Sequence, residues 1–73
     1  MQDEIITLKK GEEYIKLGQA LKLAGAASSG TEAKLFILDG AVSVNGEVET
    51  RRGRKLYPGD EVLFDDLRIV VHS

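Results

Sequence analysis

Residues 39–46 read Asp-Gly-Ala-Val-Ser-Val-Asn-Gly, and within them the residue pattern changes from that of a helix to that of a strand. Gly40 is typical of the position just after a helix, where the backbone turns left-handed. The two valines that follow are separated by one residue, which is the spacing of a strand. Asn45-Gly46 indicates a type I′ hairpin turn, because both residue types tolerate a positive φ. The chain is therefore predicted to leave a helix at Gly40, enter a strand and fold back at Gly46.

Two short helices are predicted before this stretch. The first shows the i, i+3, i+4, i+7 stripe of a helix with one buried face, at Leu17, Ala20, Leu21 and Ala24. The second begins with a capping box, in which Ser29 is the cap and Glu32 reaches back to the amide of the cap residue. We expect this second helix to run from about Gly30 to Asp39. A turn at residues 25–28 would join the two helices into a pair.

Extended segments are predicted on both sides of the helix pair. Apolar residues indicate strands near residues 5–8 and 13–16 before the pair. After it we expect the return strand of the hairpin at Glu47–Thr50, then two strands at Glu61–Phe64 and Leu67–Val71. The fold class is therefore α+β, with a two-helix pair packed on a small, mostly antiparallel sheet. Residues 1–73 are expected to form one domain.

The composition argues against catalysis. The chain has no cysteine and a single histidine, His72, so thiolate chemistry and the common metal-ligand clusters are excluded. A domain of 73 residues buries only about 60% of the surface of its unfolded chain, which leaves little room for a catalytic pocket. We expect no enzymatic activity, no cofactor and no small-molecule substrate.

Two further observations concern location. No apolar run approaches the roughly 20 residues that a membrane helix needs, and the acidic residues 1–4 lack the basic flank of a signal peptide. The expected compartment is the cytoplasm, without membrane attachment.

Positive charge is concentrated in one place. The net charge is −2, yet four of the ten basic residues lie within residues 51–55, Arg-Arg-Gly-Arg-Lys, which contain no acid. Arginine suits phosphate because its planar fork donates two parallel hydrogen bonds. The density of this cluster exceeds what pairing with a few nearby acids would explain, so an anionic partner is predicted for Arg51, Arg52, Arg54 and Lys55.

Weaker candidates lie around the helices. Lys16 stands at the entry to the first helix and Lys34 in the first turns of the second, while Lys22 carries less weight. The amides at the start of the second helix, next to Ser29, offer a site for a phosphate oxygen. Tyr57 could stack on an unpaired base, but packing on the sheet is favoured.

At this point the pattern resembles a known family, the S-four RNA-binding domain or alpha-L motif. The resemblance rests on residues 15–21, on Ser29 to Ala33, on residues 39–46 and on Pro58-Gly59-Asp60 with the two residues after it. It covers about Ile15 to Phe64, most of the chain. Small free-standing bacterial members look most similar.

The resemblance implies a surface for structured RNA, such as ribosomal or transfer RNA, including RNA that is part of a ribonucleoprotein. Its RNA-binding residues would be Lys16, Ser29, Lys34, Arg51, Arg52, Arg54 and Lys55. Many members have arginine directly after the serine, where this chain has Gly30, and this departure shifts weight onto the basic loop. An alternative is a protein-interaction module that uses the same loop on an acidic partner. We expect a monomer.

Overall fold

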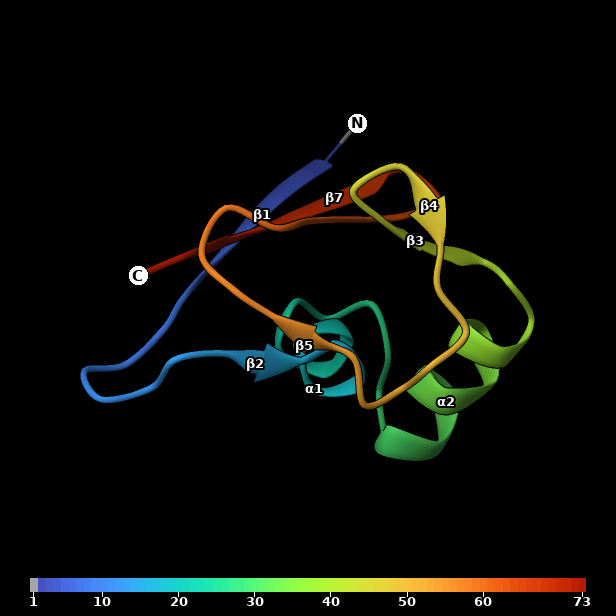
Figure 1. Cartoon of the computed structure of the whole chain (residues 1–73). Helices are drawn as coiled ribbons and strands as arrows, with labels where there is room; N and C mark the ends of the chain where they lie inside the picture. Colours follow the sequence, from blue (N-terminus) through green and yellow to red (C-terminus); the bar gives the residue numbers. More distant parts are fainter. Residues whose placement is uncertain (1) are drawn as a thin grey trace.

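The computed structural model describes residues 2–73, which form two layers (Figure 1). One layer is a five-stranded sheet in the order β1-β7-β6-β3-β4, and the other holds two helices and a two-stranded ribbon, β2-β5. The strands of the large sheet are β1 (Gln2–Thr7), β7 (Leu67–His72), β6 (Glu61–Phe64), β3 (Val42–Val44) and β4 (Glu47–Val48). The second layer contains β2 (Ile15–Lys16), α1 (Leu17–Leu23), α2 (Gly30–Leu38) and β5 (Lys55–Leu56).

Strand pairing confirms an α+β fold with a mostly antiparallel sheet. Only β1 and β7 pair in parallel, whereas β7-β6, β6-β3 and β3-β4 are antiparallel. The expectation of one sheet is wrong in one respect, because β2 and β5 form a separate ribbon in which Ile15 lies opposite Leu56. Both of these side chains are buried, so the ribbon is held by the core beneath it.

The second helix begins as the sequence predicts. Ser29 Oγ accepts a hydrogen bond from the Glu32 amide at 3.1 Å, which identifies Ser29 as the N-cap of α2. The capping box is wrong in one detail, since the Glu32 carboxylate accepts from the amide of Ser28, one residue before the cap, at 3.0 Å. Among residues 2–73, neither helix has the length and apolar character required to cross a bilayer.

The hairpin after Gly40 also forms, and a side chain ties it to the next strand. Asn45 and Gly46 have φ values of 52° and 88°, as a type I′ turn requires. Asn45 Oδ1 accepts from the amide of Glu61 at 3.0 Å, which links the turn to β6. The return strand, β4, ends at Val48 and not at Thr50, because the Glu49 carboxylate takes up the amides of Thr50 and Arg51.

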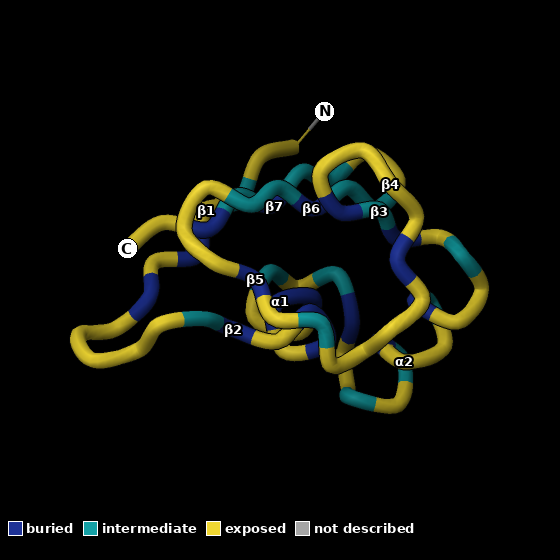
Figure 2. The backbone as a smooth tube through the Cα atoms, in the orientation of Figure 1, coloured by how far each residue is buried: buried dark blue, intermediate teal, exposed yellow. Residues whose placement is uncertain are grey.

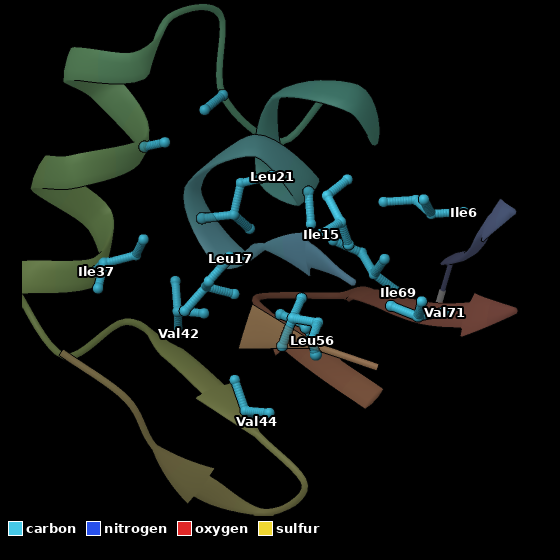
Figure 3. Close-up of a cluster of buried hydrophobic side chains, with 14 of the residues drawn as sticks. Ile6, Ile15, Leu17, Leu21, Ile37, Val42, Val44, Leu56, Ile69 and Val71 are labelled. Atoms are coloured by element: carbon cyan, nitrogen blue, oxygen red, sulfur yellow. The ribbon is translucent and has the colours of Figure 1, made fainter. Parts of the chain in front are cut away.

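Side chains from both layers meet in one hydrophobic core (Figure 3). Its largest fully buried members are Leu17, Leu21, Ile37, Leu56, Ile69, Val42, Val44, Val62 and Val71. Figure 2 shows that the exposed segments are mainly the connections around this core. Phe36 and Phe64 are only partly buried and stack on each other at its edge, with ring centroids 4.7 Å apart.

Two leucines of α1 test this arrangement directly. Leu21 is fully buried, whereas Leu23 is 64% exposed on the same helix. We expect Leu21→Ala to lower the free energy of unfolding by about 2–5 kcal/mol, through lost apolar contact and an unfilled cavity. Leu23→Ala should change it by less than about 0.5 kcal/mol. Urea unfolding followed by circular dichroism measures both, and equal losses in the two variants would contradict the placement of α1.

Candidate nucleic-acid interface

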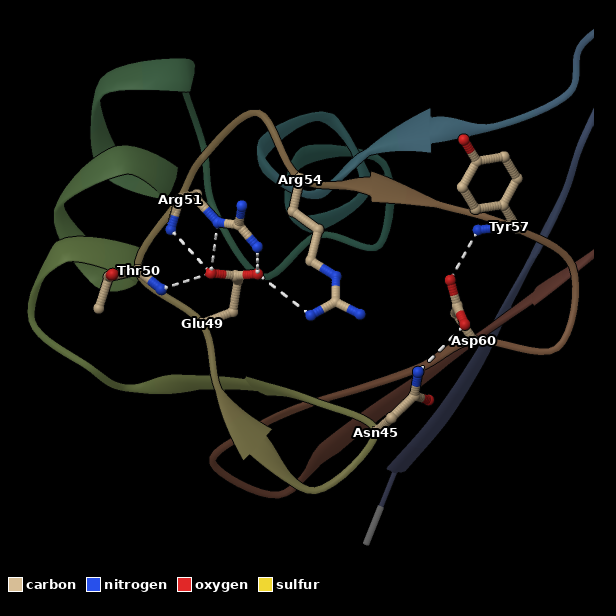
Figure 4. Close-up of polar contacts among 7 residues, drawn as sticks. All are labelled: Asn45, Glu49, Thr50, Arg51, Arg54, Tyr57 and Asp60. Atoms are coloured by element: carbon tan, nitrogen blue, oxygen red, sulfur yellow. Dashed lines mark hydrogen bonds and ion pairs between the residues drawn. The ribbon is translucent and has the colours of Figure 1, made fainter.

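The basic loop, residues 51–55, is organised by one buried carboxylate. The Glu49 side chain is only 9% exposed, and its two oxygens accept hydrogen bonds from two arginines of the loop, Arg51 and Arg54 (Figure 4). Arg51 donates through Nη2 at 3.0 Å and Nε at 3.2 Å, and Arg54 donates through Nη1 at 3.1 Å. The amides of Thr50 and Arg51 complete the set at 3.1 and 3.3 Å. Charge-assisted bonds of this kind are among the stronger hydrogen bonds in proteins.

These contacts determine the ionisation of Glu49. Hydrogen bonds from the Arg51 side chain lower the pKa of the carboxyl group from its ordinary value of 4.5 to about 2, against the opposing effect of desolvation. Bonds from Arg54 and from the Arg51 amide act in the same direction. The expectation that nearby acids could not account for the cluster is therefore wrong for Arg51 and Arg54, both of which pair with Glu49. Within residues 2–73, Arg52 makes no ion pair.

The backbone of the same loop caps α1. Lys16, the N-cap residue, makes no capping hydrogen bond with its side chain. Instead the amides of Leu17 and Gly18 donate to the carbonyls of Arg54 and Arg52, at 2.8 and 3.1 Å. This approach requires glycine at position 18, because a Cβ there would lie 2.7 Å from Arg52 Cγ. The loop and the start of α1 therefore form one continuous surface.

An open groove of about 440 Å³ lies where this surface meets the start of α2. Three of its lining residues are cationic, namely Lys16, Lys22 and Arg52, and none is acidic. Its other lining residues are small or polar: Gly18, Gln19, Gly30 and Gly53. We call this feature the basic groove. Sequence reasoning gave Lys22 little weight and missed Gln19, although Gln19 lies in the first turn of α1 and Lys22 in its last, and both line the groove.

The remaining predicted residues are not among those that line the basic groove. Lys55 is on β5, opposite Lys16 on β2, and its Nζ sits 4.9 Å from the centroid of the Tyr14 ring. Lys34 is exposed on α2, and Ser29 is occupied as the cap of that helix. Arg51 keeps 76% of its side chain exposed despite its bond to Glu49.

Tyr57 departs from the favoured expectation. It is 47% exposed and lies outside the hydrophobic core, with its ring centroid 6.0 Å from that of Tyr14. No group of three or more histidine, acidic or cysteine side chains among residues 2–73 is placed to hold a metal ion. The described surface therefore offers cations, one exposed tyrosine (Tyr57) and one half-buried tyrosine (Tyr14), and these suit a nucleic acid.

Comparison with known proteins agrees with this geometry. A family model described as the S4 domain matches residues 6–72, nearly the whole chain. The chain belongs to the S4 domain family. The expected resemblance is thus confirmed.

Relatives and a solved structure extend the comparison. The "Probable ribosome maturation protein RlbA" of Bacillus subtilis is 56% identical over 50 residues, 68% of this chain and 70% of that protein. The "Putative RNA-binding protein YbcJ" of Escherichia coli is 43% identical over 51 residues, 70% of this chain and 73% of that protein. The solution structure of YbcJ, described as revealing an alfaL motif involved in RNA-binding, superposes with a TM-score of 0.69. It is 36% identical and covers 94% of this chain and 86% of YbcJ.

The low pKa of Glu49 predicts how the stability of this protein depends on pH. A carboxyl group whose pKa is depressed in the folded state contributes stability that is fully present above its unfolded pKa. This contribution is lost as the pH falls from about 4.5 towards 2. Glu49→Gln keeps the size of the side chain but removes the charge, so it should be less stable than the parent at pH 7.

The difference between parent and Glu49→Gln should shrink steadily as the pH falls through this window. Urea unfolding midpoints of the two proteins, measured at intervals between pH 7 and pH 2.5, test this. A difference that stays constant with pH would show that the carboxylate is not the group that holds the arginines.

Proposed function

We propose that this protein binds structured RNA through the basic groove and the loop beside it, without catalysing a reaction. The observation that carries the proposal is the convergence of three cations from two separate segments on one groove that contains no acid. Two of these cations, Lys16 and Lys22, flank or belong to α1, and Arg52 comes from the loop that caps it. A site assembled in this way suits a polyanion whose phosphates lie along a curved backbone.

The physical basis is phosphate contact and not base reading. Lysine and arginine side chains that neutralise phosphates release counterions, and this supplies most of the sequence-independent affinity. Such contacts fix the position of the RNA, while the shape of the folded strand determines whether several cations can be reached at once. Arg52 is the principal contact in this proposal, because Arg51 and Arg54 are engaged with Glu49.

The overall negative charge of the protein favours binding of RNA at the basic groove over binding elsewhere on the surface. The chain has twelve acidic and ten basic residues, so its net charge does not attract a polyanion to the surface as a whole. Binding of RNA is then favoured only close to the cations of the basic groove, since screening limits the reach of each charge to about 8 Å at physiological salt. Binding in a single orientation follows from this arrangement.

The names of the relatives support a particular class of RNA. One relative is named as a ribosome maturation protein and another as an RNA-binding protein, and both match about 70% of this chain. We therefore favour ribosomal RNA, met in the cytoplasm during assembly of a ribonucleoprotein. In this proposal the protein acts as a monomeric, single-domain adaptor.

Neutralising Arg52 should reduce the electrostatic part of binding. For Arg52→Ala we expect the slope of log affinity against log salt to fall by about 1, with uniform weakening across structured RNAs. Lys10→Ala is the matched control, because Lys10 is an exposed lysine in the turn between β1 and β2, away from the residues that line the basic groove. Its slope should stay close to that of the parent.

The measurement is a fluorescence-anisotropy titration of a labelled ribosomal RNA hairpin at several salt concentrations. Circular dichroism should show that both variants keep the parent's secondary structure. If Arg52→Ala and Lys10→Ala gave the same slope, the basic groove would not be the phosphate site. If the folded parent bound no structured RNA even at low salt, the proposed function would be wrong.

A further inference from the structure

The four aromatic residues of this protein form two pairs with different environments. Phe36 and Phe64 stack at the edge of the core. Tyr14 and Tyr57, which are the only tyrosines in the chain, lie together outside it, with ring centroids 6.0 Å apart and planes inclined at 54°. Tyr57 is 47% exposed and Tyr14 is half-buried. Because the two rings are tilted, neither covers the face of the other completely.

The turn beneath Tyr57 is rigidly held. The Asp60 carboxylate accepts from the Tyr57 amide at 2.8 Å and from Asn45 Nδ2 at 3.1 Å (Figure 4). The Asp60 amide donates back to the Tyr57 carbonyl at 2.9 Å. The backbone contacts do not involve the ring, and in Figure 4 the ring extends away from Asp60 towards β2. Because the backbone holds the Tyr57 side chain in an exposed position, its ring is available to stack on another planar ring.

A second hollow, of about 520 Å³, opens beside Tyr14 and continues the basic groove. The two share Lys16 and Gln19 in their linings. Its volume lies within the range of about 300–1,000 Å³ that is common for small-ligand sites. Unlike the basic groove it is lined by two acids, Glu12 and Glu13. These carboxylates disfavour a phosphate there but not an uncharged ring.

Lys16 lies at the junction between the groove and the hollow, and a second lysine, Lys55, lies beside it. Lys16 and Lys55 lie directly opposite each other across the β2-β5 ribbon. Like charges in this position repel each other, and an anion between them relieves the repulsion. The Lys55 ammonium also lies 4.9 Å from the centroid of the Tyr14 ring. A phosphate at this junction would place its attached nucleoside next to the tyrosine pair.

We propose that the Tyr14–Tyr57 pair is a stacking site for a single unpaired base of the bound RNA, with Lys16 and Lys55 holding the phosphate beside it. The inference rests on the proposed function, since the base reaches the hollow only from a strand already seated in the basic groove. It adds a requirement that the groove alone does not impose, namely that the RNA carries a bulged or looped-out nucleotide. Stacking on tyrosine tolerates any base, so the site recognises an unpaired nucleotide more than its identity.

The chain supplies its own probe for this site. It contains no tryptophan, and both tyrosines lie at the proposed site, so intrinsic fluorescence reports on this pair alone. Two RNA hairpins would be compared, identical except that one carries a single bulged adenosine. Both should bind, but only the bulged hairpin should quench the tyrosine emission, and it should bind about tenfold more tightly.

Variants of Tyr57 separate stacking from general apolar contact. Tyr57→Phe keeps the ring and should keep the preference for the bulged hairpin, whereas Tyr57→Leu should bind the two hairpins equally. Leu23→Ala, at an exposed apolar residue far along α1, is the control and should leave the preference unchanged. Unfolding midpoints show that each variant is folded.

The outcomes distinguish the two proposals. Binding of both hairpins with equal affinity and no quenching would overturn the stacking site and leave the proposed function intact. A preference that survives in Tyr57→Leu would also overturn it. Failure of the folded parent to bind either hairpin at low salt would overturn the proposed function and the stacking site together.

Discussion

The contact between the Glu49 carboxylate and two arginines is the constraint on which the binding surface depends. A loop of residues 51–55 would otherwise hold four cations close together without compensation. By pairing with Arg51 and Arg54, Glu49 reduces their mutual repulsion and fixes the course of the loop. The loop carbonyls can then cap α1, and Arg52, which forms no ion pair within residues 2–73, lines the basic groove. A buried acid thus makes a basic surface possible.

The same arrangement explains how a protein with a net charge of −2 can present a surface for RNA. The charge that matters for binding is local, because solvent ions screen more distant groups. Lys16, Lys22 and Arg52 come from segments far apart in sequence and meet only because the loop docks on α1. Beside them the chemistry changes to tyrosine rings and carboxylates. A backbone and an unpaired base can therefore be received by neighbouring but different surfaces.

Local signals predict most of this fold from the sequence. The cap at Ser29, the turn at Asn45-Gly46 and the helical stripe in α1 each depend on residues a few positions apart, and each is found as expected. An extended segment at residues 13–16 is predicted and contains β2, but β5 and its pairing with β2 are missed, because a two-residue strand has no periodicity and its partner lies some forty residues away. The sequence also does not predict that Glu49 is buried and Tyr57 exposed, because the burial of each depends on how the loop packs. A glutamate just before an arginine cluster, at the end of a hairpin strand, is the one signal that could have suggested the pairing.

The most direct test of the groove is amide chemical-shift mapping by NMR with a ribosomal RNA hairpin. The amides of Leu17 and Gly18 donate to the carbonyls of the basic loop, so they should respond to any ligand that contacts it. We expect the largest changes at these two residues, at Lys22 and at Arg52–Gly53, with β1 and β4 nearly unaffected. Changes centred on β1 or β4 instead, with the first turn of α1 silent, would contradict the proposal that the basic groove is the RNA-binding surface.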